Sequence, residues 1–268
     1  MKSVIKSMIR RTATLGLATA AIVGSCTIGA LEALALPQEQ VLQKLGPVPM
    51  FTITDEKGAP LVASVPNQKK QSGVAGVFIN QQDAQAFINR LKTKNPNLAK
   101  NVRVVPVSLA EVYKLEQANK NKPNSPNFAF VPQQQQVDAA KQVLQQSGQN
   151  AQKFNGTPLF VAKAGKDKGY LTIKQGSGQV IPFFFNKSEL QTMLERFKKQ
   201  KPDLASTIEI QVVNLEGMLQ ALQSRNDQGL SQVVLVPPKA SVDFVRSLAP
   251  AGNQQRPQSA APQQAPKR

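Results

Sequence analysis

The residue types that most often perform enzyme chemistry are nearly absent from this sequence. Its 268 residues include no histidine and a single cysteine, Cys26. Histidine is the usual general base and a common metal ligand, and a disulfide or a thiolate metal cluster needs at least two cysteines. The composition therefore excludes serine–histidine–aspartate catalysis, cysteine–histidine catalysis and zinc catalysis.

An acid–base site would have to come from the 16 aspartates and glutamates, which are scattered along the chain. The spacings Asn80–Asp83 and Asn186–Glu189 are typical of capping boxes, in which an N-cap residue is followed by an acid at the third helical position. We interpret these acids as structural. We expect no catalytic residue, no metal site and no cofactor, and thus a protein that is not an enzyme.

The N-terminus has the pattern of a targeting segment. Four basic residues precede an apolar run from Leu15 to Ile28, which is shorter than the roughly 20 residues that span a bilayer. With Ala-Leu-Ala at 33–35, this pattern predicts a secretory signal, residues 1–35, cleaved after Ala35, and hence an exported protein. Two alternatives stay open: an uncleaved membrane anchor and a lipoprotein site at Cys26.

The chain is strongly basic, with 33 Lys and Arg residues and a formal charge of +17. Removal of residues 1–35 leaves 29 basic and 15 acidic residues, a net charge of +14. Such a charge raises nucleic acid as a partner, but the basic residues are spread along the chain and mixed with acids. We therefore predict no nucleic-acid partner, and we expect weak contact with anionic membrane surfaces or acidic polypeptides.

The second half of the chain resembles the first. An apolar triplet is followed by asparagine and a helical pattern in both halves, at Val77–Asn80 and at Phe183–Asn186. Each helical pattern stops at a proline, in Pro-Asn-Leu-Ala at 96–99 and in Pro-Asp-Leu-Ala at 202–205. These matches predict an internally duplicated α+β protein with two lobes related by a pseudo-twofold axis.

We expect each lobe to contain a small mixed or antiparallel sheet and about three helices. The lobes should cover residues 36–153 and 154–249, followed by a disordered Pro/Gln-rich basic tail at 250–268. The predicted helices are Gln81–Lys94, Leu109–Asn119, Gln134–Gln146, Lys187–Lys201, Leu215–Ser224 and Ser241–Leu248. The predicted strands are Met50–Thr54, Pro60–Val65, Val74–Ile79, Val102–Val107, Phe128–Val131, Leu159–Lys163, Tyr170–Lys174, Val180–Phe185, Thr207–Val213 and Gln232–Val236.

The apolar triplets are the candidate binding residues. Successive side chains of a strand point to opposite faces, so a strand that is apolar on both faces is either buried between two layers or lines a hydrophobic groove. Burial is the more common case, and it stays open beside the groove. Under the groove interpretation the polypeptide-binding residues are Val77, Phe78, Ile79, Phe183, Phe184 and Phe185.

These residues carry a resemblance to a known family. The sequence opens after the signal with Pro-Val-Pro-Met-Phe-Thr-Ile-Thr, Pro47–Thr54, and continues with Gly76–Asn80, its helix and the Pro-Asn-Leu-Ala element. With its repetition in the second half, this pattern resembles the cyanobacterial members of the Tic22 family over about Leu36 to Pro250. The resemblance implies a soluble, non-enzymatic factor with a pseudo-symmetric two-lobed fold.

The resemblance also implies a function. Members of this family assist protein translocation, so we expect a chaperone-like protein of the periplasm, or alternatively of the thylakoid lumen. It would hold unfolded or translocating polypeptides and assist outer-membrane protein biogenesis, with outer-membrane barrel precursors or their assembly machinery as candidate partners. The alternative is an adaptor that docks to a folded membrane translocation or assembly complex.

Overall fold

The first sheet contains five strands from the first lobe. The computed structural model places β1 between β3 and β4, antiparallel to both, while β2 pairs antiparallel with β3. The last strand, β5, pairs with β3 in parallel and forms one edge of the sheet. The strands are β1 Pro49–Asp55, β2 Val62–Ala63, β3 Val74–Phe78, β4 Val102–Ser108 and β5 Asn127–Val131.

The second sheet repeats this order with six strands from the second lobe. β10, β6, β9 and β11 take the places of β4, β1, β3 and β5, and β11 is again parallel to its neighbour. The two sheets thus share strand order and direction, and the internal duplication itself stays a prediction. The strands are β6 Pro158–Ala164, β7 Gly169–Tyr170, β8 Ile173–Gln175, β9 Gly178–Phe184, β10 Glu209–Asn214 and β11 Val233–Val236.

The structure describes residues 36–63, 73–120, 122, 125–224 and 228–248, all within one compact unit of the chain. The predicted signal at 1–35 and the predicted tail at 250–268 both lie outside the described residues and stay predictions. Within the described part of the chain, no helix is both long enough and apolar enough to cross a bilayer.

The helices follow the predicted pattern closely. α2, α4, α5 and α7 have the bounds that apolar periodicity predicts, and α6 and α9 differ at one end. The α-helices are α1 Gln38–Leu45, α2 Gln81–Lys94, α3 Pro96–Lys100, α4 Leu109–Asn119, α5 Gln134–Gln146, α6 Lys187–Gln200, α7 Leu215–Ser224, α8 Gln228–Gln232 and α9 Lys239–Leu248, and two 3₁₀ turns are η1 Ala151–Lys153 and η2 Pro202–Thr207.

One predicted strand, Tyr170–Lys174, is wrong as a single element. Tyr170 pairs with Lys163 of β6 in the short strand β7, whereas Ile173 pairs with Val180 of β9 in β8. The chain moves from one partner strand to the next within these few residues, so a single regular ladder cannot form.

The asparagines before α2 and α6 cap these helices as predicted, but the acids do not complete the expected boxes. Asn80 Oδ1 accepts from the backbone N–H of Asp83 at 2.7 Å, and Asn186 caps α6 in the same way. Asp83 instead accepts from the Asn80 side-chain amide at 2.9 Å, and Glu189 accepts from the backbone N–H of Lys239 at 3.0 Å. Glu189 therefore stabilises the N-terminus of α9 rather than that of its own helix.

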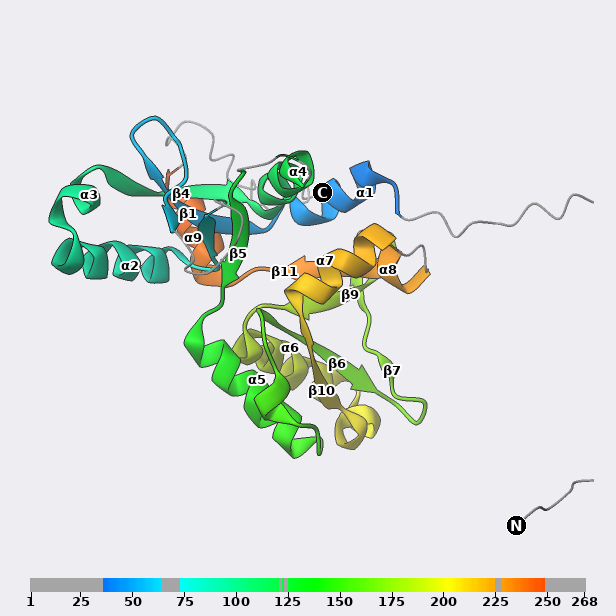
Figure 1. Ribbon diagram of the computed structural model, residues 1–268. Helices are drawn as coiled ribbons and strands as arrows, with labels where there is room; N and C mark the ends of the chain where they lie inside the picture. The colour runs from blue at the N-terminus through cyan, green and yellow to red at the C-terminus, as the bar shows by residue number, and fades with distance from the viewer. Residues whose placement is uncertain (1–35, 64–72, 121, 123–124, 225–227, 249–268) are drawn as a thin grey trace, which may run out of the picture. The chain divides into compact units, whose positions relative to one another are not determined.

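The two lobes exchange their last helices. α5, from the first lobe, packs against β6 and β10 of the second sheet, and α9, from the second lobe, packs against β1 of the first sheet (Figure 1). Gln136 of α5 accepts from the backbone N–H of Lys187 at 3.0 Å. Ser241 of α9 donates to the Ile79 carbonyl at 2.9 Å in a buried bond. Each helix is thus anchored to the strand–helix turn of the other lobe.

A single hydrophobic cluster joins the two sheets. It contains buried side chains from both sheets and from α1, α4 and α7. Met50 of β1 and Leu159 of β6 lie in it, and both are completely buried. Two smaller clusters, around Phe51 and Phe160, lie on the opposite faces under the exchanged helices. The predicted boundary at 153/154 separates the sheets, but the lobes share their core.

The Ser241–Ile79 hydrogen bond yields a stability prediction. Ser241→Ala removes the donor and leaves the buried Ile79 carbonyl without it, so we expect the free energy of unfolding to fall by about 1–2 kcal/mol. Ser247→Ala, on the same helix but exposed, is the matched control and should change it by less than about 0.5 kcal/mol. Urea denaturation followed by circular dichroism measures both. Equal effects would contradict the proposed anchoring role.

Candidate functional site

The six residues predicted to bind polypeptide lie in the core. Val77, Phe78 and Ile79 are 0%, 4% and 2% exposed, and the three phenylalanines at 183–185 are 3%, 7% and 2% exposed. The alternation sends Val77, Ile79, Phe183 and Phe185 into the shared cluster, while Phe78 and Phe184 enter the two smaller ones. Both faces of each strand are covered, so the groove interpretation is wrong at these strands and the burial alternative holds.

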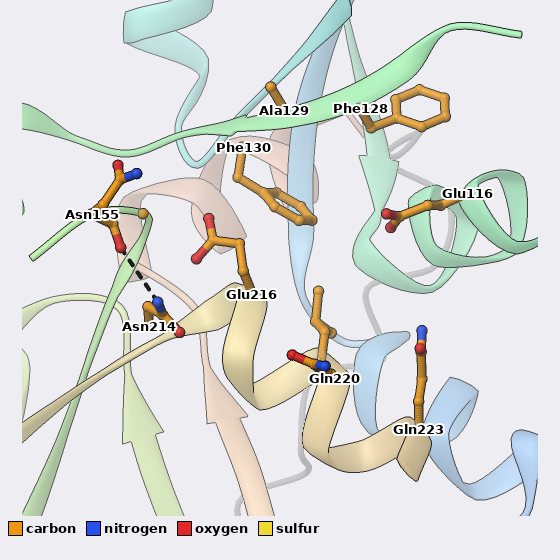
Figure 2. Close-up of a pocket in the computed structure, with 11 residues that line it drawn as sticks. Glu116, Phe128, Ala129, Phe130, Asn155, Asn214, Glu216, Gln220 and Gln223 are labelled. Atoms are coloured by element: carbon orange, nitrogen blue, oxygen red, sulfur yellow. Dashed lines mark hydrogen bonds between the residues drawn. The ribbon is translucent and has the colours of Figure 1, made fainter. Parts of the chain in front are cut away.

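An open cleft of about 570 Å³ lies along β5 instead. Its walls come from α4, β5, the turn at 155–156 and α7, and Figure 2 shows the Phe130 ring, Glu116 and Glu216 pointing into it. A smaller hollow of about 210 Å³ shares Glu116 and Phe128 with the cleft and extends it along the chain to Pro126. Together they follow the outer edge of the strand.

The backbone of β5 is unpaired on this side. Asn127 donates to the Gly73 carbonyl of the segment leading into β3 at 3.0 Å. Because backbone groups of successive strand residues point to opposite edges, the N–H and C=O groups of Phe128 and Phe130 face away from β3. Within the described residues, no hydrogen bond to these four groups is formed, so β5 is an open edge strand.

The corresponding edge of the second sheet is closed. Helix α1 packs against β11, and the Lys44 ammonium donates to the carbonyls of Val233 at 3.0 Å and Ser231 at 2.6 Å. Val233 and Leu235 are each 4% exposed, whereas Phe128 and Phe130, at the equivalent places of β5, are only partly buried. The first sheet has no counterpart of α1 over this edge among the described residues.

The wall formed by α7 is held rigidly against the turn before β6. Both carboxylate oxygens of Glu216 accept from the backbone N–H of Thr157 at 3.1 Å. Gly156 has φ +102°, and a Cβ there would lie 2.5 Å from a Glu216 oxygen, so only glycine fits. The Asn214 amide donates to the Asn155 carbonyl at 3.3 Å, the bond drawn dashed in Figure 2.

The cleft is acidic in a basic protein. Glu116 and Glu216 line its larger part, and no Lys or Arg does, although the chain contains 33 of them. Partial removal of water from the Glu116 carboxyl raises its pKa, and the nearby positive charge of Lys120 opposes this shift. Lys120 lines the adjoining hollow beside Glu116, so a cation that enters the larger cleft would meet carboxylates and amide oxygens, with one ammonium group at the margin.

The cleft has the chemistry of a binding site. It presents unpaired backbone groups, phenyl rings, amides and carboxylates, but no nucleophile with an adjacent base. Nowhere in the described segments do three or more acidic or cysteine residues come together as a metal site would require. Sequence reasoning located β5 but missed its cleft, because Phe128–Val131 and Gln232–Val236 look alike and only the fold distinguishes an open edge from a covered one.

The fold defines an α+β protein built on two mixed sheets of equal strand order with exchanged helices. The sequence profile of the Tic22-like family matches residues 3–246, and this chain therefore belongs to that family.

Three known proteins illustrate the similarity. The chain is 37% identical to Anabaena Tic22, a protein of protein transport, with a TM-score of 0.71 over 80% of this chain and 99% of the other. It is 26% identical to "Protein TIC 22, chloroplastic" of Arabidopsis thaliana over 75% of this chain and 68% of the plant protein. Tic22 from Plasmodium falciparum shares the fold, with 20% identity, a TM-score of 0.59 and coverage of 78% and 96%.

Substitution of a core phenylalanine tests whether the apolar triplets belong to the core and not to a contact surface. Phe185→Asp, or equally Phe183→Asp, places a charge in the shared cluster, so we expect loss of the cooperative unfolding transition. Phe87→Asp, at a ring that is 36% exposed, is the control and should leave a folded protein. Circular dichroism during urea titration measures both. A stable Phe185→Asp variant would return these strands to consideration as a contact surface.

The raised pKa of Glu116 predicts a pH-dependent stability. The folded state disfavours the ionised carboxyl, so Glu116→Gln should increase the free energy of unfolding slightly at pH 7. As the pH falls through the raised pKa, the folded wild-type protein takes up a proton and the difference should disappear near pH 4.

Glu56→Gln, in the exposed β1–β2 turn, removes the same charge and controls for net charge. Urea midpoints at pH 7 and pH 4 provide the measurement. An equal difference between wild type and Glu116→Gln at both pH values would contradict the assignment.

Proposed function

We propose that this protein is an exported factor of protein transport that holds unfolded or translocating polypeptides. Membership of the Tic22-like family and the 37% identity to Anabaena Tic22, a protein of protein transport, support the general role. The open edge of β5 in its cleft is the single observation that carries the holding activity.

The physical argument rests on what all polypeptides share. A protein that holds many different chains must recognise groups common to them, and unpaired backbone N–H and C=O groups can pair with any extended segment. Phe128 and Phe130 add partly exposed rings beside these groups, and burial of apolar surface strengthens such contacts without fixing a sequence.

Further parts of the proposal follow from the sequence. The pattern at 1–35 supports export, with the periplasm as the compartment and the thylakoid lumen as the alternative. Outer-membrane barrel precursors are the proposed clients, because they must cross that compartment unfolded. We further propose that the protein is not an enzyme, uses no cofactor, binds no nucleic acid, contacts membranes only peripherally, and arose by internal duplication.

A second candidate is an adaptor that docks to a folded membrane complex. The exposed basic residues of α6, among them Arg196 and Lys199, favour it, because a positive helix face can steer the protein toward an acidic partner. The two candidates differ in selectivity: a holding protein protects many unfolded chains, whereas an adaptor binds one folded partner.

An aggregation assay tests the proposal. The full chain and the chain from residue 36 are mixed with an unfolded outer-membrane barrel protein or with an unrelated unfolded protein, and light scattering is followed at low and high salt. We expect slower aggregation of both substrates that persists at high salt, since backbone pairing and apolar contact are weakly screened.

The control protein is lysozyme at the same concentration, which supplies positive charge without the cleft. Protection that disappears with salt would assign the contact to the basic surface. No protection of either substrate would reject holding and leave the adaptor candidate.

A further inference from the structure

We propose that the cleft takes a basic polypeptide segment in extended conformation, which joins the first sheet as a strand beside β5. The inference rests on the proposed function and specifies its site, its binding geometry and the chemistry of the segment it prefers. It does not involve the six buried residues of the apolar triplets.

The backbone of β5 determines the geometry. Phe128 and Phe130 each direct one N–H and one C=O away from β3, along the edge that the cleft and the adjoining hollow follow. A strand placed about 4.8 Å away would pair with all four groups. A helix cannot do so, because its backbone groups are paired internally and offer no acceptor to the two N–H groups.

The second sheet supplies the internal comparison for the charge. Phe130 lies opposite Val77 in its ladder as Leu235 lies opposite Phe183, so the outward carbonyls of Phe128 and Val233 occupy equivalent places. At Val233 this carbonyl binds the ammonium of Lys44. At Phe128 the equivalent place is open and is bordered by Glu116, with Lys120 on the side of the adjoining hollow.

The carboxylates of the cleft also favour a positively charged side chain on the incoming segment. Glu116 and Glu216 lie on two sides of the larger cleft, whose lining contains no positive residue. A lysine or arginine on the incoming strand can bind the Phe128 carbonyl and approach Glu116, while Glu216 contributes charge and keeps its bonds to Thr157. An acidic segment would be repelled at the same place.

The binding test uses a labelled peptide and the full chain. The probe is a fluorescein-labelled ten-residue peptide of alternating valine and lysine, and its twin has glutamate in place of every lysine. Fluorescence anisotropy should show saturable binding of the lysine peptide, with at least about tenfold weaker binding of the glutamate peptide. A third peptide has the lysine sequence but is methylated on its four central backbone nitrogens. Its affinity should also be at least about tenfold lower, because methylation blocks strand pairing.

Variants separate the cleft from the rest of the surface. Glu116→Gln should lower the affinity for the lysine peptide by about two- to fivefold, the range expected for one partly exposed ion pair. Glu56→Gln, which removes an equal charge outside the cleft, should not change its affinity by a measurable amount. Equal losses for the two variants would overturn the charge preference.

Amide hydrogen exchange locates the peptide. In the ¹⁵N-labelled chain, saturating lysine peptide should slow exchange of the Phe128 and Phe130 amides by about tenfold, whereas the Asn127 amide is already bonded within the sheet and should change little. Protection elsewhere without protection of these two amides would overturn the proposal. So would dimers that protect them and are not dissociated by the peptide, since a second copy would then be the occupant.

The outcomes for this inference and for the proposed function are distinguishable. If the chain slows aggregation but binds the methylated and unmethylated peptides equally, holding stands and strand addition at β5 is wrong. If the chain neither slows aggregation nor binds the lysine peptide, both are wrong. Peptide binding at β5 without protection of unfolded proteins would keep the site and reject general holding.

Discussion

A sheet has two faces, and both must be covered if its strands are apolar on both sides. Here the inner faces of both sheets share one cluster, and the outer face of each is covered by one helix of its own lobe, α2 or α6, together with one helix from the other lobe, α9 or α5. The bonds of Gln136 to Lys187 and of Ser241 to Ile79 fix these helices. The burial of the triplets depends on this exchange, because the helix of each lobe shares the cover of the outer face with the helix that comes from the other lobe.

The same arrangement explains why one edge strand is open. Two sheets of equal order produce two equivalent outer edges, at β5 and β11. Unpaired edges invite pairing with other chains, and proteins usually cover them. Helix α1 occurs once in the described chain and covers β11 with Lys44, so the near-symmetry of the sheets is broken at the edges. The uncovered strand lies between α4 and α7, which limits access to a single extended segment.

The sequence predicted local structure better than it predicted packing. Apolar periodicity predicted the observed bounds of α2, α4, α5 and α7, helped at α2 by the capping residue Asn80, because these signals depend on neighbouring residues. The sequence showed that the triplets are apolar on both faces. It did not show which helices cover those faces. An amphipathic pattern such as that of α9 states which side must be buried and cannot state which sheet covers it. The openness of β5 depends on where α1 lies, and residues 38–45 contain no signal for that.

The exchange also sets an order of events when the chain is synthesised. The Ile79 carbonyl accepts its hydrogen bond from Ser241, which lies 162 residues further along the chain. The Phe51 ring packs against Phe244, with 5.6 Å between the ring centroids. When the chain is synthesised from its N-terminus, the outer face of the first sheet is therefore not fully covered until α9 has been made. Contacts so distant in sequence form slowly, so the two lobes become compact together and only late in folding.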